Sequence, residues 1–136
     1  GRARQGSIRA PQWIKGGIAL GPKPRSFKYT LNKKVKRLAL KSALTSKVNE
    51  NSIVVLDSLN FDEIKTKNMA KVLENIKVSK ALVVISDKNI NVEASARNIP
   101  NVKTSLVNTM NTYDILKYDT LVVTKDAVAK IEEVYA

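Results

Sequence analysis

The stretch ALVVI at residues 81–85 decides the fold, because it is apolar at every position and rich in β-branched side chains. An uninterrupted apolar strand is buried on both faces, as in a parallel sheet that helices cover on each side. Two further runs have the same character, SIVVL at residues 52–56 and LVVT at residues 121–124. Together with a strand of weaker alternation at residues 102–107, they predict a four-stranded sheet.

Helices are predicted between these strands. Residues 66–77 place Met69, Val72, Leu73 and Ile76 at helical spacing, so one face of this segment is apolar. Strands that alternate with helices imply crossover connections between parallel strands. The predicted fold class is therefore α/β, a three-layer α/β/α domain with a four-stranded, mainly parallel sheet.

Three shorter helical segments complete this pattern. Residues 92–98 are followed by Pro100, which ends a helix, and Asn111 is the expected cap of a turn that runs to Leu116. Residues 125–135 form the last predicted helix. The residues expected to face inward from it are Ala127, Val128, Ile131 and Val134.

Composition bounds the classes of protein that remain. The chain has 136 residues, of which 43% are hydrophobic, so it can bury the core of one domain. It contains no cysteine and no histidine, which excludes disulfides, zinc sites, cysteine nucleophiles and histidine-based triads. No apolar run is long enough to cross a bilayer, and we expect no membrane partner.

The charge of the chain is distributed unevenly. Residues 1–49 hold 13 Lys and Arg residues and no Asp or Glu, whereas residues 50–136 hold the other 11 basic and all 12 acidic residues. The formal net charge of +12 therefore divides into +13 for the first part and −1 for the second. A polyanion is the partner expected for the first part, because so many like charges repel one another.

An extended basic arm is predicted at residues 1–25, followed by the globular α/β domain at residues 26–136. The arm holds all five glycines and three of the four prolines, so neither helical nor strand periodicity persists in it. It has little apolar surface to bury, and we therefore expect it to become ordered when it binds a partner.

A basic helix is predicted after the arm, from the cap residue Asn32 to about Val48. The face expected to pack on the domain consists of Leu31, Val35, Leu38, Ala39 and Ala43, with Ser42 and Ser46. The side chains expected to point outward are Lys33, Lys34, Lys36, Arg37, Lys41 and Lys47. A second apolar stripe, formed by Leu40, Leu44 and Val48, runs among these bases.

The carboxyl ends of the predicted strands carry Asp57, Asp87, Thr124 and Lys125. Open α/β sheets bind ligands at these ends, so a small enzyme that handles phosphoryl groups is one alternative. Asp and Thr are also ordinary capping and turn residues, and the doubled carboxylate of a firm magnesium site is absent. No βα loop contains glycine. We therefore expect no catalytic residue, metal, cofactor or small-molecule substrate.

RNA is the polyanion that the basic segment fits best. A membrane surface would require an amphipathic anchor, whereas arginine grips phosphates and glycine lets the backbone approach RNA closely. Trp13 either stacks on a base, wedges between RNA helices or packs back on the domain. A cationic regulatory domain that binds messenger RNA or a protein is a second alternative. The expected RNA-binding residues are Arg2, Arg4, Arg9, Trp13, Lys15, Lys23, Arg25, Lys28, Lys33, Lys34, Arg37 and Lys41.

The chain also resembles a known family. Residues 1–44 resemble the second half of the long loop, and the helix after it, in the ribosomal protein L4 family of the bacterial large subunit. The motifs that carry the resemblance are Gly1-Arg2-Ala3-Arg4, Gly6-Ser7, Pro11-Gln12-Trp13, Gly16-Gly17, Pro24-Arg25, Asn32-Lys33-Lys34 and Ala39-Leu40-Lys41-Ser42. Downstream, Ala96-Arg97-Asn98 and Lys125-Asp126-Ala127-Val128 also resemble this family, so the resemblance covers essentially the whole chain.

The resemblance implies a structural, non-catalytic protein of the cytoplasmic ribosome. Its partners would be large-subunit ribosomal RNA and neighbouring ribosomal proteins, and in some bacteria the messenger RNA of its own operon. It would act early in assembly and direct a loop towards the peptide exit tunnel. Family members begin with a strand, a helix and the outgoing half of the loop, none of which is present in this sequence. We therefore expect a piece of a longer chain.

Overall fold

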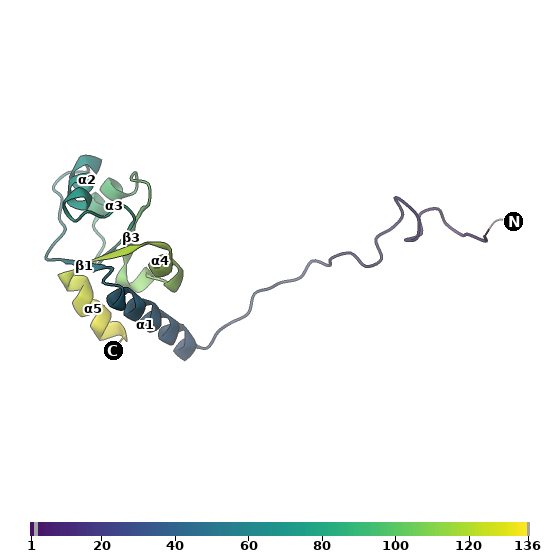
Figure 1. Cartoon of the computed structure of the whole chain (residues 1–136), viewed down its shortest axis with the longest axis horizontal. Helices are drawn as coiled ribbons and strands as arrows, with labels where there is room; N and C mark the ends of the chain where they lie inside the picture. Colours follow the sequence, from purple (N-terminus) through teal and green to yellow (C-terminus); the bar gives the residue numbers. More distant parts are fainter. Residues whose placement is uncertain (2, 136) are drawn as a thin grey trace. The chain divides into compact units, whose positions relative to one another are not determined.

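The computed structural model describes residue 1 and residues 3–135, and it divides the chain into two compact units. The N-terminal unit, Gly1–Thr30, contains no helix or strand among its described residues. The C-terminal unit, Leu31–Ala136, contains the helices and strands labelled in Figure 1. Arg2, one of the expected RNA-binding residues, lies outside the described residues.

A four-stranded parallel sheet forms the centre of the C-terminal unit. Its strands are β1 (Ile53–Leu56), β2 (Ala81–Ile85), β3 (Val102–Leu106) and β4 (Thr120–Thr124), arranged in the order β1-β4-β2-β3. Every residue of β2 is buried, and so are four of the five residues of β4. The inner strands β2 and β4 are therefore the ones buried on both faces, whereas β1, with the sequence IVVL, is apolar throughout but lies at an edge of the sheet and is only partly buried.

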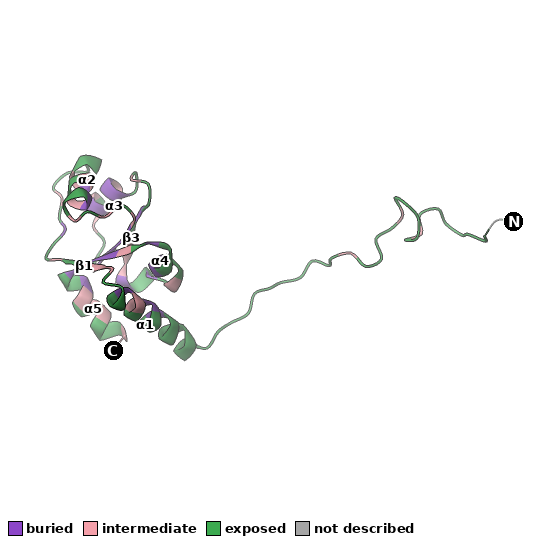
Figure 2. Ribbon diagram, in the orientation of Figure 1, coloured by how far each residue is buried: buried purple, intermediate pink, exposed green. Residues whose placement is uncertain are grey.

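Helices cover both faces of this sheet (Figures 1 and 2). On one face, α1 (Lys33–Asn49), α4 (Thr112–Lys117) and α5 (Lys125–Tyr135) pack over Leu82 and Val84 of β2. On the other face, α2 (Thr66–Asn75) and α3 (Ile90–Ala96) pack over the remaining residues of that strand. A short 3-10 turn, Val107–Thr109, precedes α4. The predicted α/β class with three layers is confirmed.

The buried face of α1 differs from the prediction. Leu40, Ala43 and Lys47 are buried, whereas Leu38 is 68% exposed and Val35 is also exposed. The core therefore combines Ala43 of the expected face with Leu40 and Leu44 of the second stripe, whereas Val48 of that stripe is exposed. The sequence pattern was misleading because Lys47 counts as polar, yet it buries its aliphatic stem and keeps its ammonium group hydrogen-bonded.

Lys47 ties α1 to the turn before β4. Its Nζ donates a hydrogen bond to the backbone carbonyl of Asp119 at 3.0 Å and lies 3.7 Å from a carboxylate oxygen of Glu50. A buried ammonium group needs such partners, because an unpaired charge in the core is strongly destabilising. Lys47 is therefore a structural residue, and the expectation that it points outward is wrong.

Two smaller differences concern helix ends. Asn32 occupies the position before α1, but its side chain makes no capping hydrogen bond, unlike Asn89 before α3 and Asn111 before α4. Val134, expected to face inward from α5, is 44% exposed because it lies in the last turn of that helix. Both differences leave the order and the type of the elements as predicted.

The end of α1 has a left-handed residue that is not glycine. Asn51 has φ 52°, its N–H donates to the carbonyl of Val48, and the N–H of Ser52 donates to the carbonyl of Lys47. These two bonds form a Schellman motif, which stops the helix and satisfies its last carbonyl groups. The chain therefore turns into β1 immediately after α1.

The depth of Leu82 in the core supplies a test of this packing. Leu82 has no exposed surface, so Leu82→Ala leaves a cavity and should lower the free energy of unfolding by about 3–5 kcal/mol. Urea unfolding followed by circular dichroism measures the change. The matched control is Leu38→Ala on the exposed face of α1, which should change stability by less than about 0.5 kcal/mol. Equal losses in both variants would contradict the observed core.

Candidate nucleic-acid interface

The first turns of α1 present a cluster of positive charge to solvent. Lys33, Lys34, Lys36, Arg37 and Lys41 are all exposed, and none of them forms an ion pair within the described residues. The first turn of the helix contains no acidic residue. Positive side chains are unfavourable at this end of a helix, because the helix dipole is itself positive there. A bound phosphate would relieve this repulsion.

The N-terminal unit carries the other expected basic residues. Each of them is exposed, and the described part of the chain offers none of them an acidic partner within ion-pair distance. Trp13 is 44% exposed. The basic residues concerned are Arg4, Arg9, Lys15, Lys23, Arg25 and Lys28.

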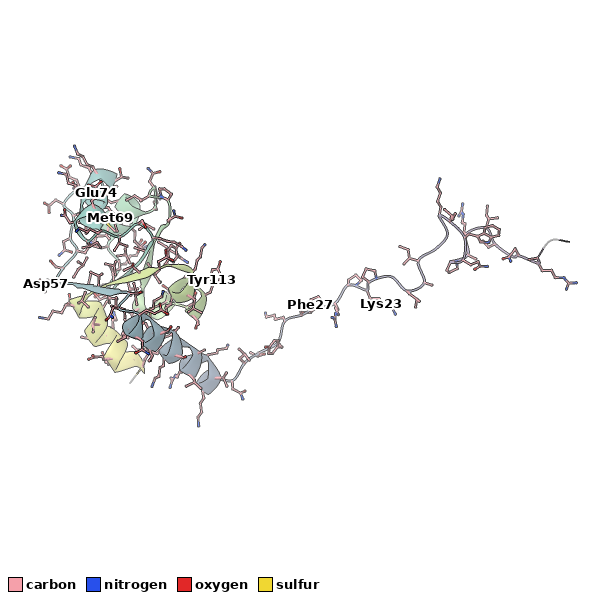
Figure 3. All side chains as sticks on the ribbon, viewed as in Figure 1. Lys23, Phe27, Asp57, Met69, Glu74 and Tyr113 are labelled. Atoms are coloured by element: carbon pink, nitrogen blue, oxygen red, sulfur yellow. The ribbon has the colours of Figure 1, made fainter. Side chains whose placement is uncertain are left out.

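Two exposed aromatic residues were missed by the sequence analysis. Phe27 is 76% exposed, and the guanidinium carbon of Arg25 lies 4.3 Å from the centroid of its ring. Tyr29 is exposed to a similar degree. Figure 3 shows the side chains of Phe27 and Lys23 along the chain before α1. Aromatic residues interleaved with bases are a signal for stacking on RNA bases, and this signal was available from the sequence.

Beyond α1, acidic residues offset the positive charge of the C-terminal unit, because residues 50–136 hold 11 basic and 12 acidic residues, although only four of those basic residues form ion pairs within the described part of the chain. Lys80 pairs with Asp119 at 3.2 Å, and Lys65 pairs with Glu63. Lys103 donates to Asp114 at 2.6 Å, and that carboxylate is buried. Uncompensated positive charge therefore concentrates before Lys47, a pattern typical of proteins that bind nucleic acid.

The carboxyl ends of the strands do not assemble the site that was considered as an alternative. A hollow of about 190 Å³ lies there, lined by Asp87 and Thr124 among others, but Asp57 and Lys125 do not line it. Asp57, which directly follows β1, is labelled in Figure 3. Among the described residues, no three acidic side chains are grouped so that they could hold a metal ion.

The carboxylate of Asp87 forms an ion pair with another residue of the domain. Its carboxylate accepts a hydrogen bond from Lys130 of α5 at 3.0 Å, and Lys130 also donates to the carbonyl of Ser86. The hydrogen bond and the positive charge of Lys130 lower the pKa of Asp87 below its usual value of 3.8. This ion pair connects α5 to the loop after β2.

Comparisons with known proteins identify the family. A model of the ribosomal protein L4/L1 family matches residues 1–134. The large ribosomal subunit protein uL4 of Acetivibrio thermocellus is 70% identical over 138 residues, and that of Ruminiclostridium cellulolyticum is 68% identical over 137 residues. Each match covers 100% of this chain and 66% of the relative, so the chain spans just under two thirds of these proteins.

The chain therefore belongs to the ribosomal protein L4/L1 family. This confirms the resemblance and the expectation of a ribosomal protein that is not an enzyme. The alternative of a phosphoryl-handling enzyme is wrong. Its physical basis is missing as well, because Asp87 is paired with Lys130, and neither Asp57 nor Lys125 lines the hollow that Asp87 and Thr124 share. No helix within the described residues is long and apolar enough to cross a membrane.

The pairing of Asp87 with Lys130 predicts a shift in titration. In Lys130→Met, the pKa of Asp87 should rise towards its usual value of 3.8, because the hydrogen bond and the nearby charge are lost. The stabilising effect of the native pair should be present above that value and disappear as the pH falls through the lowered pKa of the folded protein. NMR titration of the Asp87 carboxyl carbon measures this shift. Lys71→Met, which removes a lysine of α2 that forms no ion pair within the described residues, should leave the pKa of Asp87 unchanged.

Proposed function

We propose that this chain binds large-subunit ribosomal RNA as a structural constituent of the large ribosomal subunit. The observation that carries the proposal is the exposed basic segment before Lys47, which contains no acidic residue and no ion pair within its described part. RNA phosphates would supply the missing negative charge. The arm at residues 1–25 and the first turns of α1 would each contribute contacts to RNA.

RNA is favoured over other polyanions by the kinds of residue that accompany the charge. Arginine can hold a phosphate through two parallel hydrogen bonds and can stack on a base, and Arg25 already lies over the ring of Phe27. The exposed aromatic side chains of Trp13, Phe27 and Tyr29 offer stacking surfaces in the same segment. A simple electrostatic tail would not require these rings.

The wider role follows from the family resemblance. We propose that the chain takes part in early assembly of the subunit, in contact with ribosomal RNA and neighbouring ribosomal proteins in the cytoplasm. Residues 1–25 would be the returning half of a loop that the whole protein directs towards the peptide exit tunnel. Messenger RNA of the protein's own operon would bind through the same basic surface, because its phosphates present the same charge.

The proposal predicts a steep dependence of RNA affinity on salt. If about eight phosphates are neutralised, a plot of log K against log salt concentration should have a slope of about −6 to −7. Filter binding of the 136-residue chain to large-subunit ribosomal RNA, at salt concentrations from about 50 to about 200 mM, measures this slope. A flat salt response, or unchanged affinity after deletion of residues 1–25, would rule out the proposed interface.

A set of charge-neutralising substitutions tests the contribution of α1. Replacing four bases of this helix with glutamine should weaken binding and make the salt slope shallower by up to about 3–4 units, since each phosphate contact contributes about 0.7–0.9. Thermal stability should not fall, because all four side chains are exposed and make no ion pair within the described residues, and two of them lie in the first turn, where positive charge opposes the helix dipole. The residues to be replaced are Lys33, Lys34, Arg37 and Lys41.

The matched control removes the same amount of charge elsewhere. Four exposed lysines with no ion pair in the described structure lie outside the basic segment, and their replacement by glutamine should leave the slope within about one unit of the original. If both quadruple variants behave alike, net charge alone governs binding and α1 is not part of the interface. The control residues are Lys67, Lys71, Lys88 and Lys125.

A further inference from the structure

The N-terminal unit contains one locally closed loop. Three successive turns are closed by backbone hydrogen bonds from Ala10 to Ser7, from Trp13 to Ala10 and from Gly16 to Trp13. The N–H of Gly17 then donates to the carbonyl of Arg9 at 2.8 Å, which brings the ends of residues 9–17 together. We refer to residues 9–17 as the 9–17 loop. Compact loops whose ends meet in this way are often functional.

Only glycine fits at position 16 of the 9–17 loop. A β-carbon there would collide with the carbonyl oxygen of Ala10 and would lie 2.9 Å from the carbonyl oxygen of Trp13. Both obstacles are backbone atoms that take part in the turns, so neither can move without opening the loop. At the neighbouring Gly17, a β-carbon would meet only the carbonyl oxygen of Arg9, at an ordinary contact distance of 3.5 Å. Gly17 can therefore be replaced by alanine without a steric clash, whereas Gly16 cannot.

The sequence of the 9–17 loop has a half-exposed tryptophan between two basic residues, Arg9 and Lys15. Trp13 lies at its middle and is 44% exposed, whereas the next residue, Ile14, is 94% exposed. Arg9 closes one end, and Lys15 follows Trp13 with a left-handed φ of 65°. A non-glycine residue adopts this backbone conformation only where its neighbours impose it. The loop thus fixes the chain on either side of the tryptophan.

We propose that the 9–17 loop is a preformed site for an unpaired RNA base, which stacks on Trp13 while Arg9 and Lys15 hold the adjoining phosphates. The proposal rests on the RNA-binding function proposed above and specifies what that segment recognises. Charge alone would be served by an open chain, because phosphates are contacted equally well by flexible lysines and arginines. A closed loop that depends on one glycine is needed when an aromatic ring must be held ready before binding.

The ligand class follows from where bases are accessible in RNA. In a paired helix the base faces are stacked on one another, whereas a bulged or looped base can leave the stack and meet an aromatic side chain. Base–aromatic stacking tolerates any base, so the 9–17 loop would select an unpaired nucleotide rather than a sequence. The other basic residues of the segment would contribute affinity without this selectivity.

The test compares two RNA hairpins of equal length, one fully paired and one with a single bulged adenosine in its stem. The intact chain should bind the bulged hairpin about tenfold more tightly, as expected from the lower range of stacking energies. Trp13 is the only tryptophan of the chain, so stacking should quench the intrinsic fluorescence with the bulged hairpin alone. Equal affinity for both hairpins, without quenching, would overturn the proposal.

Gly16→Ala and Gly17→Ala form a matched pair of variants. Gly16→Ala should abolish the preference for the bulged hairpin and the quenching, while the salt slope stays unchanged because no charge is altered. Gly17→Ala should keep both properties, since its β-carbon has room. If both variants retain the preference, or both lose it, the geometry of the 9–17 loop does not determine recognition and the proposal fails.

Substitutions of the ring separate stacking from folding of the loop. Trp13→Phe keeps an aromatic face and should retain most of the preference, whereas Trp13→Leu should remove it. If the leucine variant keeps the preference, the ring is not the stacking surface. Failure of this inference is distinguishable from failure of the proposed function, because a chain that binds both hairpins equally with a steep salt slope still binds RNA. A flat salt response would remove both.

Discussion

Burial of β2 and β4 on both faces is the constraint on which the rest of the C-terminal unit depends. Their side chains alternate between two hydrophobic cores, so each face of the sheet must be covered by helices. On the face covered by α1, α4 and α5, the core requires from α1 chiefly Leu40, Ala43, Leu44 and the stem of Lys47. The first turns of α1 are left outside the core. This division lets one helix both complete the domain and carry a dense group of positive charges.

Most of the fold could be predicted from the sequence, because the core places strong demands on its pattern. The run ALVVI corresponds to β2 residue by residue, and the last helix begins at Lys125 as expected. Asn111 caps α4 through its side chain, as a short polar residue before a helical turn suggests. Such local features are readable because each depends on residues close together in the chain.

The orientation of α1 could not be predicted, because two apolar stripes compete on its surface. The choice between them depends on Ile115 and Tyr118 of the region around α4, which lie far away in the sequence and pack against Leu40 and Ala43. The loop that contains Trp13 was equally hidden, since its closure depends on the hydrogen bond from the backbone N–H of Gly17 to the carbonyl of Arg9. The exposure of the basic residues could be predicted without knowledge of tertiary contacts, because a charged side chain without a partner stays in solvent.

The exposed chain before α1 also has a consequence for the lifetime of the protein. The described residues before α1 contain no helix or strand, and several arginines and lysines lie exposed along them. Proteases that cleave after basic residues act on extended, accessible backbone, whereas a packed sheet must first open. If the segment binds RNA as proposed, free copies would be trimmed in it, and copies bound to RNA would survive. Degradation of the unbound chain would then keep its amount in step with the RNA available to receive it.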